Sequence, residues 1–270
     1  LKRQQAGQAA LSRSPPLLPA AAPSRAGAMT TAFFSSSGLR LRYSDSGPSS
    51  GSPAIVWVHG LNNSLEYWAD VLPRLGGYRH VCLDVSGHGQ SQGRTGAATL
   101  QELGGDVQQL MRHLGLERVV LVGHSMGGAV VQRVAVDAPQ SVLALVLVAT
   151  SSRVGSAARS FYEKEAASSE ENGHPGVAAV QRAMSTLNMD KELPRLQGMP
   201  SMVLQGDADQ LTPLKAGQML RDLLPGSQMT VIPGRGHDLL REGPEAAEAL
   251  RAWLAAAGLG PGAGPPASKL

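Results

Sequence analysis

The chain has 270 residues, of which 42% are apolar, 4% aromatic and 17% charged, with a formal net charge of +3. This composition predicts a globular protein with a sizeable core, and the scarcity of aromatic side chains argues against a protein that stacks nucleic-acid bases. Residues 1–28 hold four basic side chains and no acid, so the remainder carries about −1 and offers no basic face to a polyanion.

Residues 1–28 are rich in Ala, Pro, Ser and Gln and lack apolar periodicity, so we predict that they are disordered. We expect Met29 to be the natural start of the protein. The alternative is that residues 1–28 form a transit peptide for a plastid or mitochondrion, because they combine Arg and Ser with an absence of acids.

The body of the chain, residues 29–257, alternates between short apolar runs and helical stretches. Val, Leu and Ile dominate runs of three to seven residues, which predicts strands buried on both faces of a parallel sheet. An antiparallel hairpin precedes them, and strand–helix alternation predicts a doubly wound α/β fold. The predicted strands are 31–36, 39–44, 54–58, 81–85, 119–122, 143–149, 202–204 and 229–232, and the predicted helices are 65–75, 100–114, 126–136, 214–224 and 244–254.

Residues 151–199 interrupt this alternation with two helix-like pieces, 156–169 and 176–189, neither followed by its own strand. An insertion between two strands, where their carboxyl ends open, is where a lid over an active site would lie. We expect an apolar underside of this lid to line the substrate site, although Met and aromatic side chains at helical spacing are more often simple packing residues. The candidate lining residues are Phe161, Tyr162, Met184, Leu187 and Met189.

From residue 258 the sequence is rich in Gly and Pro, and we predict a flexible tail over 258–270. It ends in Ser268-Lys269-Leu270, which is the peroxisomal import tripeptide, so a peroxisomal import receptor is an expected partner. Without that signal or a transit peptide we expect a cytoplasmic protein. No apolar run reaches the ~18 residues of a transmembrane helix.

Ser125 is the predicted nucleophile. It lies in the pattern Gly123-His124-Ser125-Met126-Gly127, between a predicted strand and a predicted helix, which is the strand–turn–helix context that a G-x-S-x-G nucleophile needs. The two glycines leave space where side chains would collide with neighbouring elements. The backbone N–H of Met126, which directly follows the nucleophile, is one predicted donor of an oxyanion hole.

A serine hydroxyl needs a base, and the base needs an orienting acid. His237 follows the last predicted strand, and Asp207 and Asp209 both follow the strand before it. The carboxyl ends of parallel strands meet at one edge of a sheet, so we expect these groups to reach Ser125. His237 is the predicted base, and spacing alone leaves the acid open between the two aspartates.

Over residues 31–254 the chain resembles the α/β-hydrolase superfamily. The resemblance implies a mostly parallel twisted sheet flanked by helices with a short helical lid. It implies that Asp209 is the acid, because the family's G-x-x-D-x-x-x-P pattern reads Gly206, Asp209 and Pro213 here. The family's HG motif matches His59-Gly60 and implies that the Leu61 N–H is the second oxyanion donor.

The loop from Asp84 to Ser91 matches the family pattern D-x-x-G-x-G-x-S, and we expect it to support the nucleophile turn rather than to react. His59 and His124 are likewise expected to hold their loops. No cluster has metal-ligand spacing, and neither G-x-G-x-x-G nor a P-loop occurs, so we predict catalysis without metal or cofactor. Cys82, the single cysteine, excludes an intrachain disulfide and is expected in the core.

The resemblance implies a serine hydrolase that cleaves carboxylic esters. The body is most similar to enol-lactone hydrolases and to haloperoxidase-like and monoacylglycerol-lipase-like esterases, although its lid of roughly 45 residues is shorter. Serine at position 125 argues against epoxide hydrolases and dehalogenases, which have aspartate there. Two alternatives remain open: a cofactor-free C–C hydrolase or lyase with the same triad, and a ligand receptor derived from a hydrolase.

Overall fold

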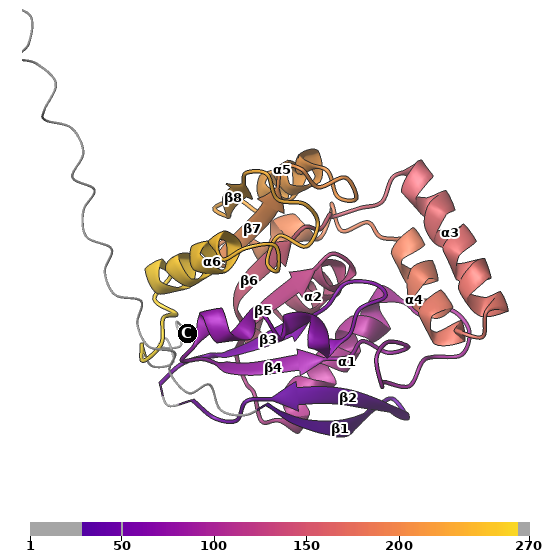
Figure 1. Cartoon of the computed structure of the whole chain (residues 1–270), viewed down its shortest axis with the longest axis horizontal. Coiled ribbons are helices and arrows are strands. Elements are labelled where there is room, and N and C mark those ends of the chain that lie inside the picture. The colour runs from indigo at the N-terminus through magenta and orange to yellow at the C-terminus, as the bar shows by residue number, and fades with distance from the viewer. Residues whose placement is uncertain (1–28, 50, 264–270) are drawn as a thin grey trace, which may run out of the picture.

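The computed structural model describes residues 29–49 and 51–263 (Figure 1). The predictions made for residues 1–28 and for Ser268, Lys269 and Leu270 lie outside these ranges. Within them, no helix combines the length and the apolar character needed to cross a membrane.

The described residues form an eight-stranded sheet with the order β1-β2-β4-β3-β5-β6-β7-β8. The hairpin β1–β2 is antiparallel and so is its pairing with β4, while every later pair is parallel. The predicted α/β class with a mostly parallel sheet is therefore confirmed. The strands are β1 Thr30–Ser36, β2 Leu39–Asp45, β3 Ala54–Val58, β4 Arg79–Leu83, β5 Val119–His124, β6 Val142–Val148, β7 Ser201–Gly206 and β8 Gln228–Ile232.

Helices cover both faces of this sheet, so it has two cores (Figure 1). In β3, Val56 and Val58 pack in the core beneath α1 and α2, whereas Ile55 and Trp57 pack in the core beneath η1, η2 and α6. Burial on both faces explains why the runs are continuously apolar. The helices are η1 Leu65–Trp68, η2 Leu72–Leu75, α1 Leu100–His113, α2 Met126–Asp137, η3 Pro139–Ser141, α3 Ser156–Glu171, α4 Pro175–Ser185, η4 Leu193–Leu196, α5 Leu214–Leu223 and α6 Glu245–Ala256.

Several predicted elements differ from the structure. The second helix of the insertion, expected at 176–189, is α4 and ends at Ser185. The helix expected at 65–75 is instead the pair of short 3₁₀ turns η1 and η2. Pro73 lies in the first turn of η2, where it has no N–H to donate and so interrupts a continuous helix. The strand expected at 81–85 is β4, which begins and ends two residues earlier.

The insertion forms a helical cap made of α3 and α4, which pack on each other. Most of α4 is buried, whereas Ala166 is the buried residue of α3. At the start of α4, main chain lies directly on main chain: a Cβ added to Gly176 would lie 2.7 Å from the Cα of Gly93 and 2.9 Å from that of Gly87. The cap is thus docked on the loop after β4 by contacts that only glycines permit.

The body extends further toward the C-terminus than the sequence suggests. Leu259 is buried in the core beneath α6, and the Gly262 N–H donates a hydrogen bond to the Ser52 hydroxyl at 3.0 Å. The start of the predicted tail thus contacts the domain through the Leu259 side chain and the Gly262 N–H.

The glycine contacts predict how the cap can be loosened. Gly176→Ala places a methyl group against two main-chain atoms, so we expect it to lower the free energy of unfolding by ~1–3 kcal/mol and to expose residues 151–199 to proteolysis. Chemical denaturation and limited proteolysis measure these effects. Gly155→Ala is the matched control, since a Cβ there meets nothing within 4 Å; equal behaviour of the two variants would contradict the docking role of Gly176.

Candidate active site

Ser125 lies at a strained turn between β5 and α2. Its φ of 54° and ψ of −120° are unfavourable for a residue with a Cβ, and such strain is common at functional sites. The turn is held from both sides: the Ser125 N–H donates to the Val148 carbonyl at 2.9 Å, and the Ser125 carbonyl accepts from the Thr150 hydroxyl at 2.7 Å.

The glycines of the motif are required by packing. A Cβ on Gly127 would overlap the carbonyl oxygen of Val58 at the end of β3, and a Cβ on Gly123 would overlap the carbonyl of Gly127. The main chains of β3, β5 and α2 therefore approach as closely as glycine allows. Any larger residue would push the turn, and with it Ser125, away from the edge of the sheet.

His237 and Asp209 form a hydrogen-bonded pair at the same edge. Nδ1 of His237 lies 2.9 Å from Oδ2 of Asp209, and the N–H groups of Leu211 and Thr212 donate to Oδ1, each at 2.9 Å. Burial raises the pKa of Asp209, but these hydrogen bonds to the carboxylate outweigh burial and hold the pKa below its ordinary value. Asp207 instead accepts from the Gly234 N–H at 2.6 Å.

His124 connects this pair to the nucleophile turn. Its Nε2 donates to the main-chain carbonyl of His237 at 2.9 Å, and the two imidazole rings are 4.8 Å apart. Because His124 directly precedes Ser125, this hydrogen bond ties His237 to the residue beside Ser125. Tyr67 stacks on the His124 ring, with centroids 4.8 Å apart, and donates its hydroxyl to Asp238 at 2.9 Å.

The loop after β3 lies directly against the nucleophile turn, since a Cβ on Gly60 would be 3.2 Å from the Cβ of Ser125. His59 fixes this loop: its Nδ1 donates to the Gly60 carbonyl at 2.7 Å, and its Nε2 accepts from the Val85 N–H at 3.1 Å. In the described part of the chain, the backbone N–H groups of Leu61 and Met126 donate no hydrogen bond to the protein. Neither N–H is therefore engaged by another described residue.

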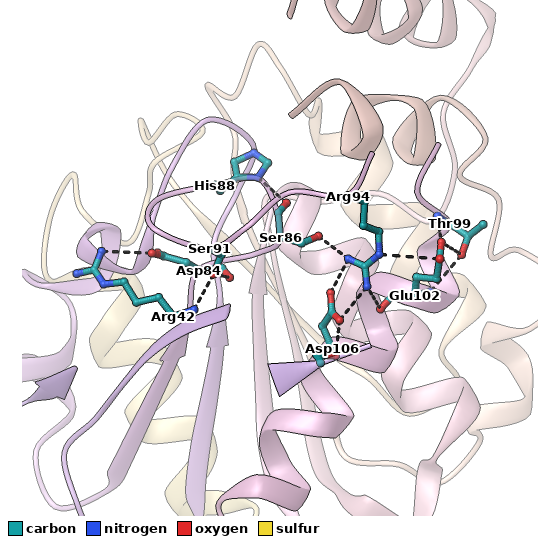
Figure 2. A network of polar contacts seen from close by, with 10 residues as sticks. Arg42, Asp84, Ser86, His88, Ser91, Arg94, Thr99, Glu102 and Asp106 are labelled. Carbon is teal, nitrogen blue, oxygen red and sulfur yellow. Dashed lines mark hydrogen bonds and ion pairs between the residues drawn. The ribbon is translucent and has the colours of Figure 1, made fainter. Parts of the chain in front are cut away.

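The loop from Asp84 to Ser91 is a structural support. The Asp84 carboxylate accepts from the backbone N–H groups of Leu65 and Gln90, at 2.7 and 2.9 Å, and from Arg42 at 3.2 Å. Figure 2 shows a second ion pair beyond it, in which Arg94 binds Asp106 at 2.7 Å. Buried charges persist only when paired in this way, so these groups fix the loops behind the turn.

The lid candidates are divided between core and surface. Met184, Leu187 and Met189 are buried in the main core, and Tyr162 packs against it. Phe161 is 56% exposed, so it points to solvent and does not line an apolar underside. A cavity of about 570 Å³ lies between the start of α1 and the end of α4; Leu187 and Met189 line it, whereas Ser125 and His237 do not.

Two polar residues that surround the pair were not singled out from the sequence. Gln205 is fully buried in β7 and donates to Asp209 Oδ2 at 3.2 Å, and Tyr67 contacts His124 as described. The only available signal for Gln205 is an amide inside an otherwise apolar strand. Among residues 29–49 and 51–263, no three His, Cys, Asp or Glu side chains are grouped as a metal site.

Comparison with known proteins identifies the fold. Residues 53–167 match the family described as alpha/beta hydrolase fold. A dihydrolipoyllysine-residue acetyltransferase component of an acetoin cleaving system from Cupriavidus necator is 41% identical over 117 residues, which are 43% of this chain and 31% of the relative. The matched segment spans about a third of the length of the first curated relatives.

Solved structures match over most of the chain. A thermophilic esterase from Thermogutta terrifontis is 25% identical with a TM-score of 0.73, and the match covers 85% of this chain and 98% of the esterase. The enol-lactonase from Burkholderia xenovorans is 22% identical with a TM-score of 0.74, covering 83% of this chain and 100% of the lactonase. The predicted fold and its likeness to enol-lactonases are thereby confirmed.

The buried histidines predict a pH dependence of stability. Burial lowers the pKa of His59 to about 3 and those of His80 and His124 to about 4, from 6.5. Below pH 6.5 the unfolded chain therefore binds protons that the folded chain rejects until about pH 4. We expect the free energy of unfolding to fall through this window, by up to ~1.4 kcal/mol per pH unit for each histidine.

Urea denaturation at pH 7.5, 6.5, 5.5 and 5.0 tests this expectation. His80 accepts from the Trp57 indole at 3.1 Å and donates to the Leu75 carbonyl at 3.0 Å, so its second proton would break a buried hydrogen bond. A His80→Gln variant should accordingly show a shallower dependence. A free energy of unfolding that stays constant from pH 7.5 to 5.0 would contradict the assignment of neutral buried histidines.

Proposed function

Because the chain has the α/β-hydrolase fold, we propose that it is a serine hydrolase that cleaves carboxylic esters, including lactones, through an acyl-enzyme on Ser125. The observation that carries the proposal is the strained turn at Ser125 beside the Asp209–His237 hydrogen bond of 2.9 Å, at one edge of the sheet. A hydroxyl at such a turn with an oriented imidazole nearby is the arrangement that acyl transfer needs.

In the proposed reaction, His237 Nε2 removes the proton of Ser125 as Oγ attacks the ester carbonyl. Asp209 accepts the hydrogen bond of Nδ1, which leaves Nε2 as the basic nitrogen and stabilises the imidazolium. The same proton passes to the leaving alcohol when the C–O bond breaks. Water, deprotonated by His237, then attacks the acyl group and regenerates Ser125.

The free N–H groups of Leu61 and Met126 suit the oxyanion of the tetrahedral intermediate. Such donors lower the barrier because their positions are fixed before the charge develops. Two contacts support this role: His59 holds the loop that carries Leu61, and Met126 is at the start of α2. The names of the solved esterase and lactonase support ester substrates.

Substitution of the three proposed residues tests the mechanism. We expect Ser125→Ala and His237→Ala each to lower kcat/KM for p-nitrophenyl esters by ~10³-fold or more, and the double variant to be little worse, because they act as one unit. Asp209→Asn should retain more activity than either. Activity assays together with fluorophosphonate labelling make the measurement; wild-type turnover by Ser125→Ala would reject Ser125 as the nucleophile.

The acid assignment has a matched control in the neighbouring aspartate. Asp207→Asn removes a carboxylate that binds only the turn after β8, so it should keep most of the activity. Near-normal turnover by Asp209→Asn, with loss in Asp207→Asn, would transfer the acid role to Asp207. Absence of hydrolysis across esters and lactones by the wild-type protein would reject the proposed function itself.

We further propose that medium acyl chains are cleaved faster than acetyl. We expect a cap as short as residues 151–199 to leave part of the substrate cleft uncovered, and each added methylene that becomes buried to contribute up to ~0.8 kcal/mol until the site is filled. A series of p-nitrophenyl esters from acetate to decanoate, compared by kcat/KM, measures this. A steady fall from acetate onward would contradict it and indicate a small closed pocket.

A further inference from the structure

We propose that Gln205 is a positioning residue, whose side-chain amide fixes the carboxylate of Asp209 in the orientation that His237 uses. The inference rests on the proposed function for its catalytic consequence. The geometric part of the inference comes from the described hydrogen bonds. This part can be tested without any substrate.

Gln205 is the penultimate residue of β7 and is fully buried. Its Nε2 lies 2.7 Å from the carbonyl oxygen of Thr212 and 3.2 Å from Oδ2 of Asp209. The amide thus binds both ends of the short loop that starts at Asp209. The side chain of Gln205 in β7 therefore bridges the two ends of this loop.

The orientation of the amide follows from its partners. A main-chain carbonyl and a carboxylate oxygen can only accept, so the NH₂ group must face both of them. The other end, Oε1, has no hydrogen-bond partner among the described residues, and it faces α5, where a Cβ on Gly217 would lie 3.2 Å away. An unpaired buried carbonyl is unfavourable, so an apolar side chain of similar size would fit this strand better. The hydrogen bonds of the NH₂ group offset that disadvantage.

The carboxylate of Asp209 accepts four hydrogen bonds, two at each oxygen. The N–H groups of Leu211 and Thr212 hold Oδ1, and His237 and Gln205 share Oδ2. Rotation of the carboxylate about its Cβ–Cγ bond would move both oxygens, and the two backbone donors oppose it at Oδ1. The Gln205 donor opposes it at Oδ2, the oxygen that faces the imidazole.

The charge of the side chain at position 205 distinguishes a positioning role from a role in packing alone. A neutral amide donates to Oδ2 without competing for the proton on His237. A carboxylate at position 205 would instead be a second acceptor beside Asp209, and its negative charge would stabilise the imidazolium of His237. An apolar side chain would remove the donor and leave the charge unchanged.

Two substitutions and one control test the proposal in the full chain. Gln205→Met preserves the approximate length and volume without a donor, and Gln205→Glu adds the charge. Gln132→Met is the matched control, because Gln132 is equally buried, donates to the Ser151 carbonyl at 3.1 Å and has an unpaired Oε1, yet contacts neither Asp209 nor His237.

We expect Gln205→Met to lower kcat for p-nitrophenyl esters about tenfold with KM unchanged within about twofold, since the change affects the base and not substrate binding. Gln205→Glu should move the acid limb of the pH profile of kcat/KM upward by about one pH unit. Gln132→Met should change neither quantity, whatever it does to the melting temperature.

Histidine NMR separates this inference from the proposed function. The titration of His237, assigned by its loss in His237→Ala, should move to higher pH in Gln205→Glu, and its Nδ1 proton should lose its hydrogen-bonded resonance position in Gln205→Met. These shifts in a protein without esterase activity would support Gln205 while rejecting the function. An unchanged His237 signal in both folded variants, or equal effects of Gln132→Met, would overturn the proposal.

Discussion

The site depends on one steric constraint, which is the contact of the β3 main chain with the turn between β5 and α2. Gly127 lies under the carbonyl of Val58, so the turn cannot relax away from the sheet without losing that contact. The positive φ of Ser125 persists because β3, β6 and Thr150 hold the residues around it. Strain of this kind survives only where the surroundings over-determine the backbone.

The polar groups around the turn follow from the same constraint, because close packing excludes water from several loop ends. Each buried imidazole then binds a main-chain group: His59 binds the Gly60 carbonyl and His124 that of His237. Burial lowers the pKa of both imidazoles and keeps them neutral, so they support their loops without changing charge near neutral pH. His237 differs in being partly exposed and in facing a carboxylate, and this contrast separates the proposed base from its supports.

The strands and the nucleophile turn were predictable because local sequence determines them. Burial on both faces gives β3 and β5 their continuous apolar runs, and Gly123 and Gly127 are required by the turn itself. Pro73 is a local signal against a continuous helix over 65–75, whereas no local pattern indicates that Leu259 reaches the core. Gln205 was missed for a similar reason, since only folding brings Thr212 and Asp209 to its amide.

The path of the last described residues has a practical consequence. Gly262 binds Ser52, just before β3, and Pro261 lies against Gly77, just before β4, so the chain leaves the body at the amino ends of these strands (Figure 1). Ser125, Asp209 and His237 follow carboxyl ends of strands, at the opposite edge. A protein attached to a solid support close to residue 263 would therefore present the edge that carries Ser125, Asp209 and His237 to the solution.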